Sequence, residues 1–366
     1  MQLAVCCLVS TQIKIINVEL EKKKYMKSFF FNWRNLLFMG LVSLLLISCG
    51  GGNGKGKRRS SSLLPSVTGT AFDVLVVGSQ AYWKDTVGRA LFDVLNQDMP
   101  GFFQSEPLFN IIFLKEPDFN GVMRPVRNII FFDIDDAVYT QGKISYFKDR
   151  WASPQSIVRI AAPNKEEFLK VLSEKKDEMI SYLVDAERKR STSFYTKYSN
   201  RTLANKLKKA LDVDMVVPSH IDKSRIEKDF IWMSNANIDM TQNIVVYAYP
   251  YNRKDDFKLK NLLAKRDSVM KKYIAGPTDG SYMTTEYRCD PYYREMTDEK
   301  GRYVVEIRGL WRVEGDVMGG PFVSRSYYDE KRGRVLTTET YLYGPNKKKR
   351  NIIRQLEAMI RTVDFD

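Results

Sequence analysis

The chain has 366 residues, of which 58 are Lys or Arg, 44 are Asp or Glu and one is His, so its formal net charge is +14. A single histidine excludes a His-rich metal centre, and a Ser-His-Asp triad would have to use His220. His220 lies in a polar stretch, and the chain has no Gly-x-Ser-x-Gly motif to supply its partner. Composition therefore argues against the common histidine-dependent enzymes.

Residues 1–48 have the pattern of a signal peptide. Lys27 and Arg34 precede 13 mostly apolar residues, numbers 36–48, which is shorter than the roughly 20 residues of a membrane-spanning helix. Acidic residues before Met26 are atypical of a signal peptide, so we expect translation to start at Met26.

The apolar run ends in Leu-Ile-Ser-Cys49, followed by three glycines. This stretch resembles the lipobox of bacterial lipoprotein precursors, which are cut before the cysteine and carry diacylglycerol on its sulfur. The resemblance implies a lipidated Cys49, with acyl chains such as palmitate, as the membrane anchor, and residues 49–65 as a flexible tether.

The mature chain then has two cysteines, Cys49 and Cys289, so no intramolecular disulfide can form and a hydrophobic core must hold the fold. Residues 1–48 contain six basic and two acidic residues. Their removal leaves 52 basic and 42 acidic residues, a net charge of +10. About 300 residues suffice for one large or two ordinary domains. We expect two halves, residues 66–211 and 212–366.

In the first half, apolar runs predict strands at residues 72–77, 109–114 and 126–134, and apolar spacing predicts a helix at 83–97. Ser79 is the expected cap of that helix. The turn before it lacks a Gly-x-Gly-x-x-Gly pattern, so we interpret it as plain strand-to-helix geometry and expect no cofactor.

Three carboxylates, Asp133, Asp135 and Asp136, follow the third strand. Such a cluster could serve a metal-assisted hydrolase. The competing interpretation is a solvated strand end whose Asp residues form turns, and it is favoured because no His or Glu motif accompanies the cluster.

A recurring pattern of strand, proline, asparagine and helix occurs at Pro163-Asn164, at Pro250 with Asn252, and at Pro345-Asn346. Each proline ends a strand, and each asparagine is expected to cap a helix. The first of these helices should run to about residue 211, with a break near Ser191 or at Asn200.

Further strands are predicted at residues 215–217, 230–233, 243–249, 305–313, 322–328 and 335–343. On residues 305–313 the odd positions are mostly apolar, while Glu306, Arg308 and Arg312 occupy a face expected to be solvated. The predicted fold is α+β, with antiparallel sheets and packed helices.

Residues 314–321 form a glycine-rich loop that contains Val317 and Met318. Apolar side chains among glycines have little core to enter, so the loop, with neighbouring Trp311, is a candidate partner-binding site.

The segments Gly309–Arg312, Gly315-Asp316, Met318–Ser324, Arg127–Asp135 and Trp151–Gln155 together resemble a family of Bacteroidota envelope lipoproteins known as domain of unknown function 4837. The resemblance implies an envelope lipoprotein and brings no activity or ligand. Because no acidic residue follows Cys49 before Asp73, it favours the periplasmic face of the outer membrane. That compartment, and a positive charge excess lying partly in the tether, exclude a nucleic-acid partner.

We therefore favour a non-catalytic binding or envelope-assembly module with an envelope protein partner. The alternatives are a metal-assisted hydrolase on Asp133, Asp135 and Asp136, and a carrier of lipid or glycan, which the 20 Tyr, 20 Phe and 5 Trp would suit. Thr86 and Ser268 lie in Asp-Ser/Thr-apolar triplets that resemble O-glycosylation sites of this phylum.

Cys49→Ala should leave a precursor that is neither lipidated nor membrane-bound, because the acyl-accepting thiol is gone. Membrane fractionation after a high-salt wash measures this. A variant that still partitions with membranes would contradict the lipobox hypothesis.

Overall fold

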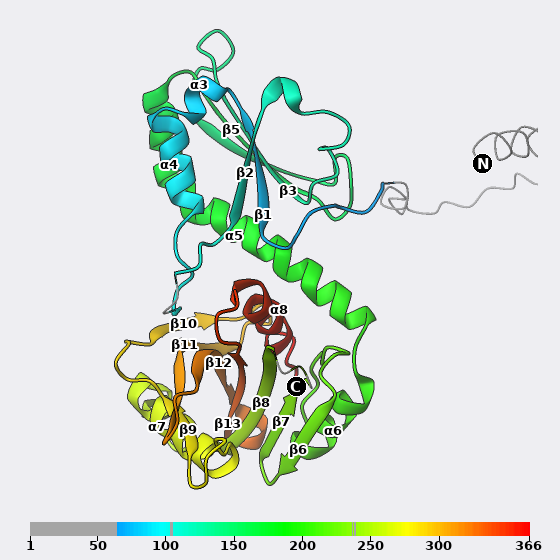
Figure 1. The fold of residues 1–366 in the computed structure, drawn as a ribbon, viewed down its shortest axis with the longest axis vertical. Coiled ribbons are helices and arrows are strands. Elements are labelled where there is room, and N and C mark those ends of the chain that lie inside the picture. Colours follow the sequence, from blue (N-terminus) through cyan, green and yellow to red (C-terminus); the bar gives the residue numbers. More distant parts are fainter. Residues whose placement is uncertain (1–63, 103–104, 236, 238) are drawn as a thin grey trace, which may run out of the picture. The chain divides into compact units, whose positions relative to one another are not determined.

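The computed structural model describes residues 64–102, 105–235, 237 and 239–366, which belong to one compact unit, Ser61–Asp366. Cys49 and the expected signal peptide lie outside the described residues. Two β-sheets with packed helices make up this unit, which confirms the α+β class (Figure 1).

The first sheet has five strands in the order β2-β1-β3-β5-β4. The pairs β2-β1, β1-β3 and β3-β5 are parallel, and β4 pairs with β5 in antiparallel fashion. The prediction of antiparallel sheets is therefore wrong for these three pairs, because the near-continuous apolar runs of β1 and β5 are typical of parallel strands buried on both faces. The strand bounds are β1 (Asp73–Gly78), β2 (Asn110–Lys115), β3 (Asn128–Ile134), β4 (Lys143–Lys148) and β5 (Ser156–Ala162).

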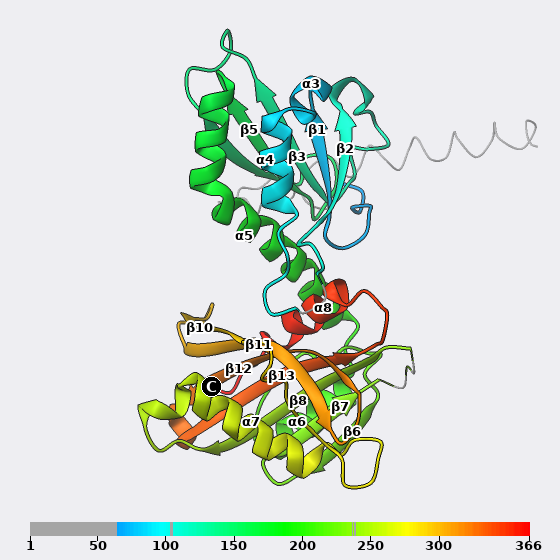
Figure 2. The ribbon, with the colours of Figure 1, turned by 60° about the vertical axis from the view of Figure 1, so that its left-hand side comes forward.

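Helices cover one face of the first sheet (Figure 2). They are α3 (Gln80–Trp83), α4 (Thr86–Leu95) and the first part of α5 (Lys165–Lys197). On α4, Val87, Leu91 and Leu95 recur at i, i+4 and i+8 and are fully buried. Asp85 caps α4, and Ser79, the expected cap, makes no side-chain capping bond.

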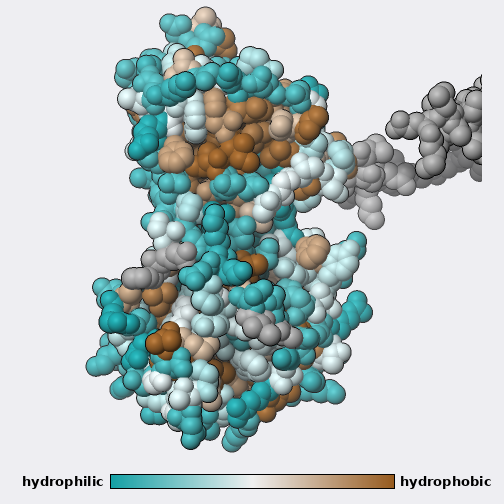
Figure 3. Space-filling view, in the orientation of Figure 1, coloured by the Kyte–Doolittle hydropathy of each residue, from teal (hydrophilic) through white to brown (hydrophobic). Residues whose placement is uncertain are grey.

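The opposite face of the first sheet has no α-helix over it among the described elements. Its apolar side chains are covered in part by residues 116–126, which include the short 3₁₀ helix η1 (Glu116–Asp118). Figure 3 shows the resulting apolar patch over β1, β2 and β3. Its partly buried members are Leu114, Phe119, Met123, Val126, Phe131 and Trp151.

The second sheet has eight strands, seven in the order β10-β11-β12-β13-β8-β7-β6, with β9 paired to β11. All of its pairs are antiparallel. The bounds are β6 (Lys223–Glu227), β7 (Phe230–Ser234), β8 (Thr241–Pro250), β9 (Tyr282–Thr285), β10 (Tyr292–Thr297), β11 (Tyr303–Glu314), β12 (Gly319–Asp329) and β13 (Arg334–Tyr343).

Helices lie on both faces of the second sheet. Leucines of α6 (Arg201–Leu211) and apolar residues of α8 (Arg350–Ile360) share one core with the sheet, while α7 (Leu259–Tyr273), preceded by η2 (Lys254–Phe257), packs on the other face. The 3₁₀ helix η3 (Glu330–Arg332) joins β12 to β13. Helix α6, which the sequence analysis groups with the first half, thus packs with the second sheet.

A segment of the first half also enters this second core. Met99 is 2% exposed and belongs to the same apolar cluster as α6 and α8. At Gly101, φ is 75° and a Cβ would lie 2.5 Å from the Cβ of Arg308, so only glycine permits this close approach to β11.

The three expected asparagine caps have different outcomes. Asn164 caps α5, its side chain accepting a bond from the backbone N–H of Glu167 at 2.9 Å. Asn252 caps no helix, because a 3₁₀ turn intervenes before α7 begins. At α8 the cap is Glu106, whose carboxylate accepts bonds from the backbone N–H groups of Lys349 at 2.8 Å and Arg350 at 2.9 Å.

Several other element predictions are tested by the structure. The break in the helical region falls at residues 198–200, where Asn200 caps α6, and this confirms one of the two expected positions. The strand predicted at residues 215–217 is wrong. Strands β4, β6, β9 and β10 were not predicted, because they lack a continuous apolar run, and β4, β6 and β10 also carry exposed polar residues.

Glu106→Ala should destabilise the protein by about 1–2 kcal/mol, the usual cost of a lost helix cap. Asn346→Gly is the matched control, since Asn346 has φ 58° and does not cap α8, and it should change stability by less than about 0.5 kcal/mol. Urea unfolding measures both. A larger loss of stability in the Asn346 variant than in the Glu106 variant would contradict the assignment of Glu106 as the cap.

Candidate functional site

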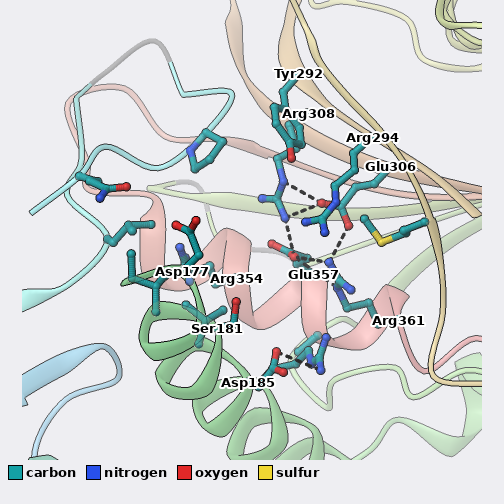
Figure 4. A pocket seen from close by; sticks show the side chains of 18 of the residues that line it. Asp177, Ser181, Asp185, Tyr292, Arg294, Glu306, Arg308, Arg354, Glu357 and Arg361 are labelled. Carbon is teal, nitrogen blue, oxygen red and sulfur yellow. Dashed lines mark hydrogen bonds and ion pairs between the residues drawn. The ribbon is translucent and has the colours of Figure 1, made fainter. Parts of the chain in front are cut away.

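A cavity of about 680 Å³ is lined by α5, α8, β10, β11 and residues of the segment 97–108 (Figure 4). This volume falls in the range of small-molecule sites. Ten of its 21 lining residues are charged, and Glu306 and Arg308 of β11 form a network with Glu357 and Arg361 of α8.

The network joins two carboxylates to two arginines. Arg308 contacts Glu306 at 2.8 Å and Glu357 at 2.6 Å. Arg361 contacts Glu357 at 3.0 Å and also pairs with Glu306. Glu306 and Arg308 are two residues apart on β11 and share a face, while Glu357 and Arg361 are one turn apart on α8.

This arrangement corrects the expectation that Glu306 and Arg308 occupy a solvated face. Glu306 is 3% exposed, and the Arg308 side chain is 12% exposed. The face is covered because α8, which follows β11 by about forty residues in the sequence, packs against it.

Positive charge exceeds negative charge in the buried part of the cavity wall. Arg325 lies 3.8 Å from Glu306, and Arg354 lies on α8 one turn before Glu357. Of these two, Arg354 lines the cavity together with Arg308 and Arg361, which makes three arginines against two glutamates in this wall.

Arg354 donates no hydrogen bond to any residue that the structure describes. Its Nε is buried without an acceptor, and its guanidinium lies 4.7 Å from the ring centroid of Phe72. Burial lowers the pKa of Arg354 to about 10. The Arg354 guanidinium is therefore a partly desolvated cation that packs against the Phe72 ring.

The pKa of Glu357 is lowered as well, but by neighbouring charges and not by burial. Burial alone would raise the pKa of Glu357, but the charges of Arg308 and Arg361 hold it well below its usual range. For Arg308, burial would lower the pKa, and Glu357 with Glu306 raises it above its ordinary value. Both groups therefore remain charged at neutral pH.

The α5 wall of the cavity is acidic. Asp177 and Ser181 are exposed and have no hydrogen-bond or ion-pair partner among the described residues, while Asp185 pairs with Arg188 at 3.1 Å. Arg294 on β10 is also exposed and likewise unpaired within the described part of the chain.

The β11–β12 loop lies beside a second cavity, of about 520 Å³. Asp316 holds the loop by accepting bonds from the backbone N–H of Val317 at 2.6 Å and of Met318 at 3.2 Å. Val317 is fully exposed, whereas Met318 packs against the core and Trp311 is 3% exposed. Of the three candidate contact residues, Val317 is thus the one available to a partner.

The carboxylates of the Asp133 cluster make local contacts. Asp133 accepts a bond from the Tyr139 hydroxyl at 2.8 Å, and Asp135 accepts one from the backbone N–H of Ala137 at 2.9 Å, as in a turn. Asp136 is exposed. Within residues 64–102, 105–235, 237 and 239–366, no group of three or more His, Cys, Asp or Glu is placed to hold a metal ion.

Both candidate glycosylation residues are exposed helix residues. Thr86 is the first residue of α4, and Ser268 lies in α7. The preceding acids are engaged, since Asp85 caps α4 and Asp267 accepts bonds from Thr285 and Tyr287. Modification at these residues stays a prediction.

Sequence reasoning missed the arginine cavity. The available signal was the alternation Glu306-x-Arg308 together with the helical spacing Arg354-x-x-Glu357-x-x-x-Arg361. Each pattern by itself is typical of a solvated face. The charged residues become largely buried because α8 packs against β11, and the sequence patterns do not show this contact.

Residues 200–362 match a family model described as Domain of unknown function (DUF4837), and residues 67–196 match one described as Domain of unknown function (DUF8532). The segments Arg127–Asp135 and Trp151–Gln155, attributed above to the first family, therefore lie in the match to the second. No curated protein matches the chain. A solved structure, that of a point mutant of Protein Mog1, aligns at 11% identity over 42% of this chain and 90% of its own, with a TM-score of 0.28.

Glu357→Gln should cost about 3–5 kcal/mol at pH 7, because it leaves Arg308 and Arg361 buried beside one carboxylate fewer. The folded-state pKa lies below the unfolded value of about 4.3, so the stabilisation is present above that value and is lost as the pH falls through the folded-state pKa. The difference in the free energy of unfolding between wild type and variant, measured by urea unfolding, should therefore become smaller at acidic pH.

Glu174→Gln is the matched control for that measurement, since Glu174 is an exposed residue of α5. It should change stability by less than about 0.5 kcal/mol. Equal effects of the two changes would contradict the buried network.

Proposed function

The chain belongs to the DUF4837 family through residues 200–362, and from that premise we propose that it is a non-catalytic module that binds a protein partner at the bacterial envelope. The lipobox-like sequence at Cys49 supports attachment to a membrane, and we propose the periplasmic face of the outer membrane as its location. No helix in the described part of the chain is long and apolar enough to cross a membrane.

The observation that carries the proposal is the open face of the first sheet (Figure 3). Ile112 on β2 is 47% exposed, Val122 is 78% exposed, and Phe147 on β4 is 43% exposed. Ile112 pairs with Leu75 and Phe147 pairs with Ile157, and both of these partners belong to the cluster that holds the partly buried aromatic residues Phe131 and Trp151. Contiguous apolar surface of this kind on a soluble domain marks an interaction site.

The composition of the face favours a protein over a small ligand. Aromatic residues and Met123 belong to it, together with the exposed charged residues Arg124, next to Met123, and Arg159, two residues after Ile157 on β5. An apolar, aromatic-rich centre with a charged rim is the usual anatomy of a protein–protein interface.

The face also adjoins the point where the described chain begins. Ser66 pairs with Ser153, and Thr68 pairs with Val126, in the segments that carry part of the apolar face.

Ile112→Lys should abolish capture of the partner by crosslinking in the native envelope, because it places a charge in an apolar contact. Stability should change little, since Ile112 is an exposed position. Mass spectrometry of the crosslinked species measures capture, and urea unfolding measures stability.

Ile226→Lys is the matched control, since Ile226 is 43% exposed on β6, an edge strand of the second sheet as β2 is of the first. It should leave capture intact. Val317→Ser tests the loop in the same assay. Loss of capture in the Ile226 or Val317 variant, with capture retained in the Ile112 variant, would place the interface elsewhere and overturn this proposal.

A further inference from the structure

We propose that the cavity lined by α5, α8, β10 and β11 binds a small water-soluble anion, with Arg354 and Arg294 holding its carboxylate or phosphate group. This site is distinct from the open face of the first sheet and does not depend on a protein partner.

The first argument is the hydrogen-bonding state of Arg354. A guanidinium has five donors arranged as a planar fork, which matches a carboxylate or a phosphate. None of these donors meets an acceptor among the described residues, and Nε is buried without one. Buried donors without acceptors are rare and unfavourable, and a bound oxyanion would supply the missing acceptor.

Arg354 is also held in place before any ligand arrives. Its guanidinium lies 4.7 Å from the centre of the Phe72 ring, within the range of a cation–π contact. Phe72 has φ 65° and is 3% exposed, so this ring has a fixed position in the core of the first sheet. Little side-chain freedom remains to be lost on binding.

The second argument is the charge balance. The α8–β11 wall of the cavity holds Arg308, Arg354 and Arg361 against Glu306 and Glu357, so one positive charge in that wall has no counterpart. Excess buried charge of one sign is unfavourable unless it is compensated. Burial lowers the pKa of Arg354 to about 10, which is the response expected of a cation that lacks its counterion.

Arg294 extends the site to the mouth of the cavity. It is exposed on β10, lines the same cavity as Arg354, and has no ion-pair partner among the described residues. The exposed Arg294 can contact an anion as it enters, and the more deeply placed Arg354 can then bind it inside the cavity.

The acidic wall limits what the ligand can be. Asp177, Ser181 and Asp185 line the cavity from α5, and of these Asp177 and Ser181 have no described partner (Figure 4). A second anionic group would be repelled there, whereas a hydroxyl or ammonium group would be accepted. The ligand therefore carries one anionic group, and its remainder meets both polar residues and the apolar lining residues Leu108, Ile180 and Val184.

The test is nuclear magnetic resonance of the arginine Nε–H groups in the purified ¹⁵N-labelled protein. Inorganic phosphate and acetate are titrated separately, with ionic strength held constant by chloride. At least one anion should give saturable shifts of the Arg354 and Arg294 signals. The anion that saturates at the lower concentration identifies the preferred group, carboxylate or phosphate.

Arg354→Met should weaken the binding of that anion at least tenfold, and Arg294→Gln should weaken it several-fold. Arg89→Gln, at an exposed α4 residue paired with Asp93, is the control and should leave binding unchanged. Arg354→Met should fold, because it removes no hydrogen bond to the described residues. Thermal unfolding checks this.

The proposal is overturned if neither anion gives a saturable shift, or if Arg354→Met binds as wild type does. Should the Arg354 variant fail to fold, Arg294→Gln decides the matter, since it alters an exposed side chain. Unchanged affinity in that variant would then overturn the proposal. Partner capture by the first sheet is measured separately and does not enter these outcomes.

Discussion

Two buried carboxylates, Glu306 and Glu357, make it possible for arginines to lie inside this protein. Arg308 and Arg361 each contact both of them, and through these contacts α8 is joined to β11. An apolar pairing of the same elements would be at least as stable, because desolvation offsets much of what an ion pair contributes. Stability therefore does not explain why the charges are there. Their place on the wall of a cavity points to a use in binding.

The two sheets differ in how completely they are covered. The second sheet has helices on both faces, so its apolar side chains are enclosed in two cores. The first has helices on one face alone among the described elements, and loops cover the other in part. A partner on the open face would complete for the first sheet the two-sided burial that the second achieves by itself.

Much of the fold could be predicted from local sequence, for a physical reason. Strands such as β1 and β3 are buried on at least one face, and burial selects the apolar runs that mark them. Asn164 was identifiable as a cap because capping acts over three residues. The parallel order of the first sheet was not identifiable, since pairing joins segments distant in sequence.

The candidate sites show the same limit. Val317 is exposed because its own loop contains glycines, which is local information. Whether Glu306 meets water or α8 depends on a helix about forty residues later, and the cap of α8 comes from Glu106, more than two hundred residues earlier. Asn346 was predicted to cap α8 because a sequence pattern considers only residues a few positions from the helix, and Glu106 is not among them. Trp311 was assigned to a contact surface for the same reason, although the sheet buries it.

The segment around Met99, Gly101 and Glu106 lies in the match to DUF8532 and yet completes the core and the α8 terminus of the region that matches DUF4837. Connecting segments usually tolerate insertions, because little depends on their length. Here the length of the segment is constrained, because Met99 lies in the core of the second sheet, Gly101 lies against Arg308 and Glu106 caps α8. Evolutionary drift in this segment should therefore be slow, and the two family regions should be inherited as a pair and not exchanged separately between proteins.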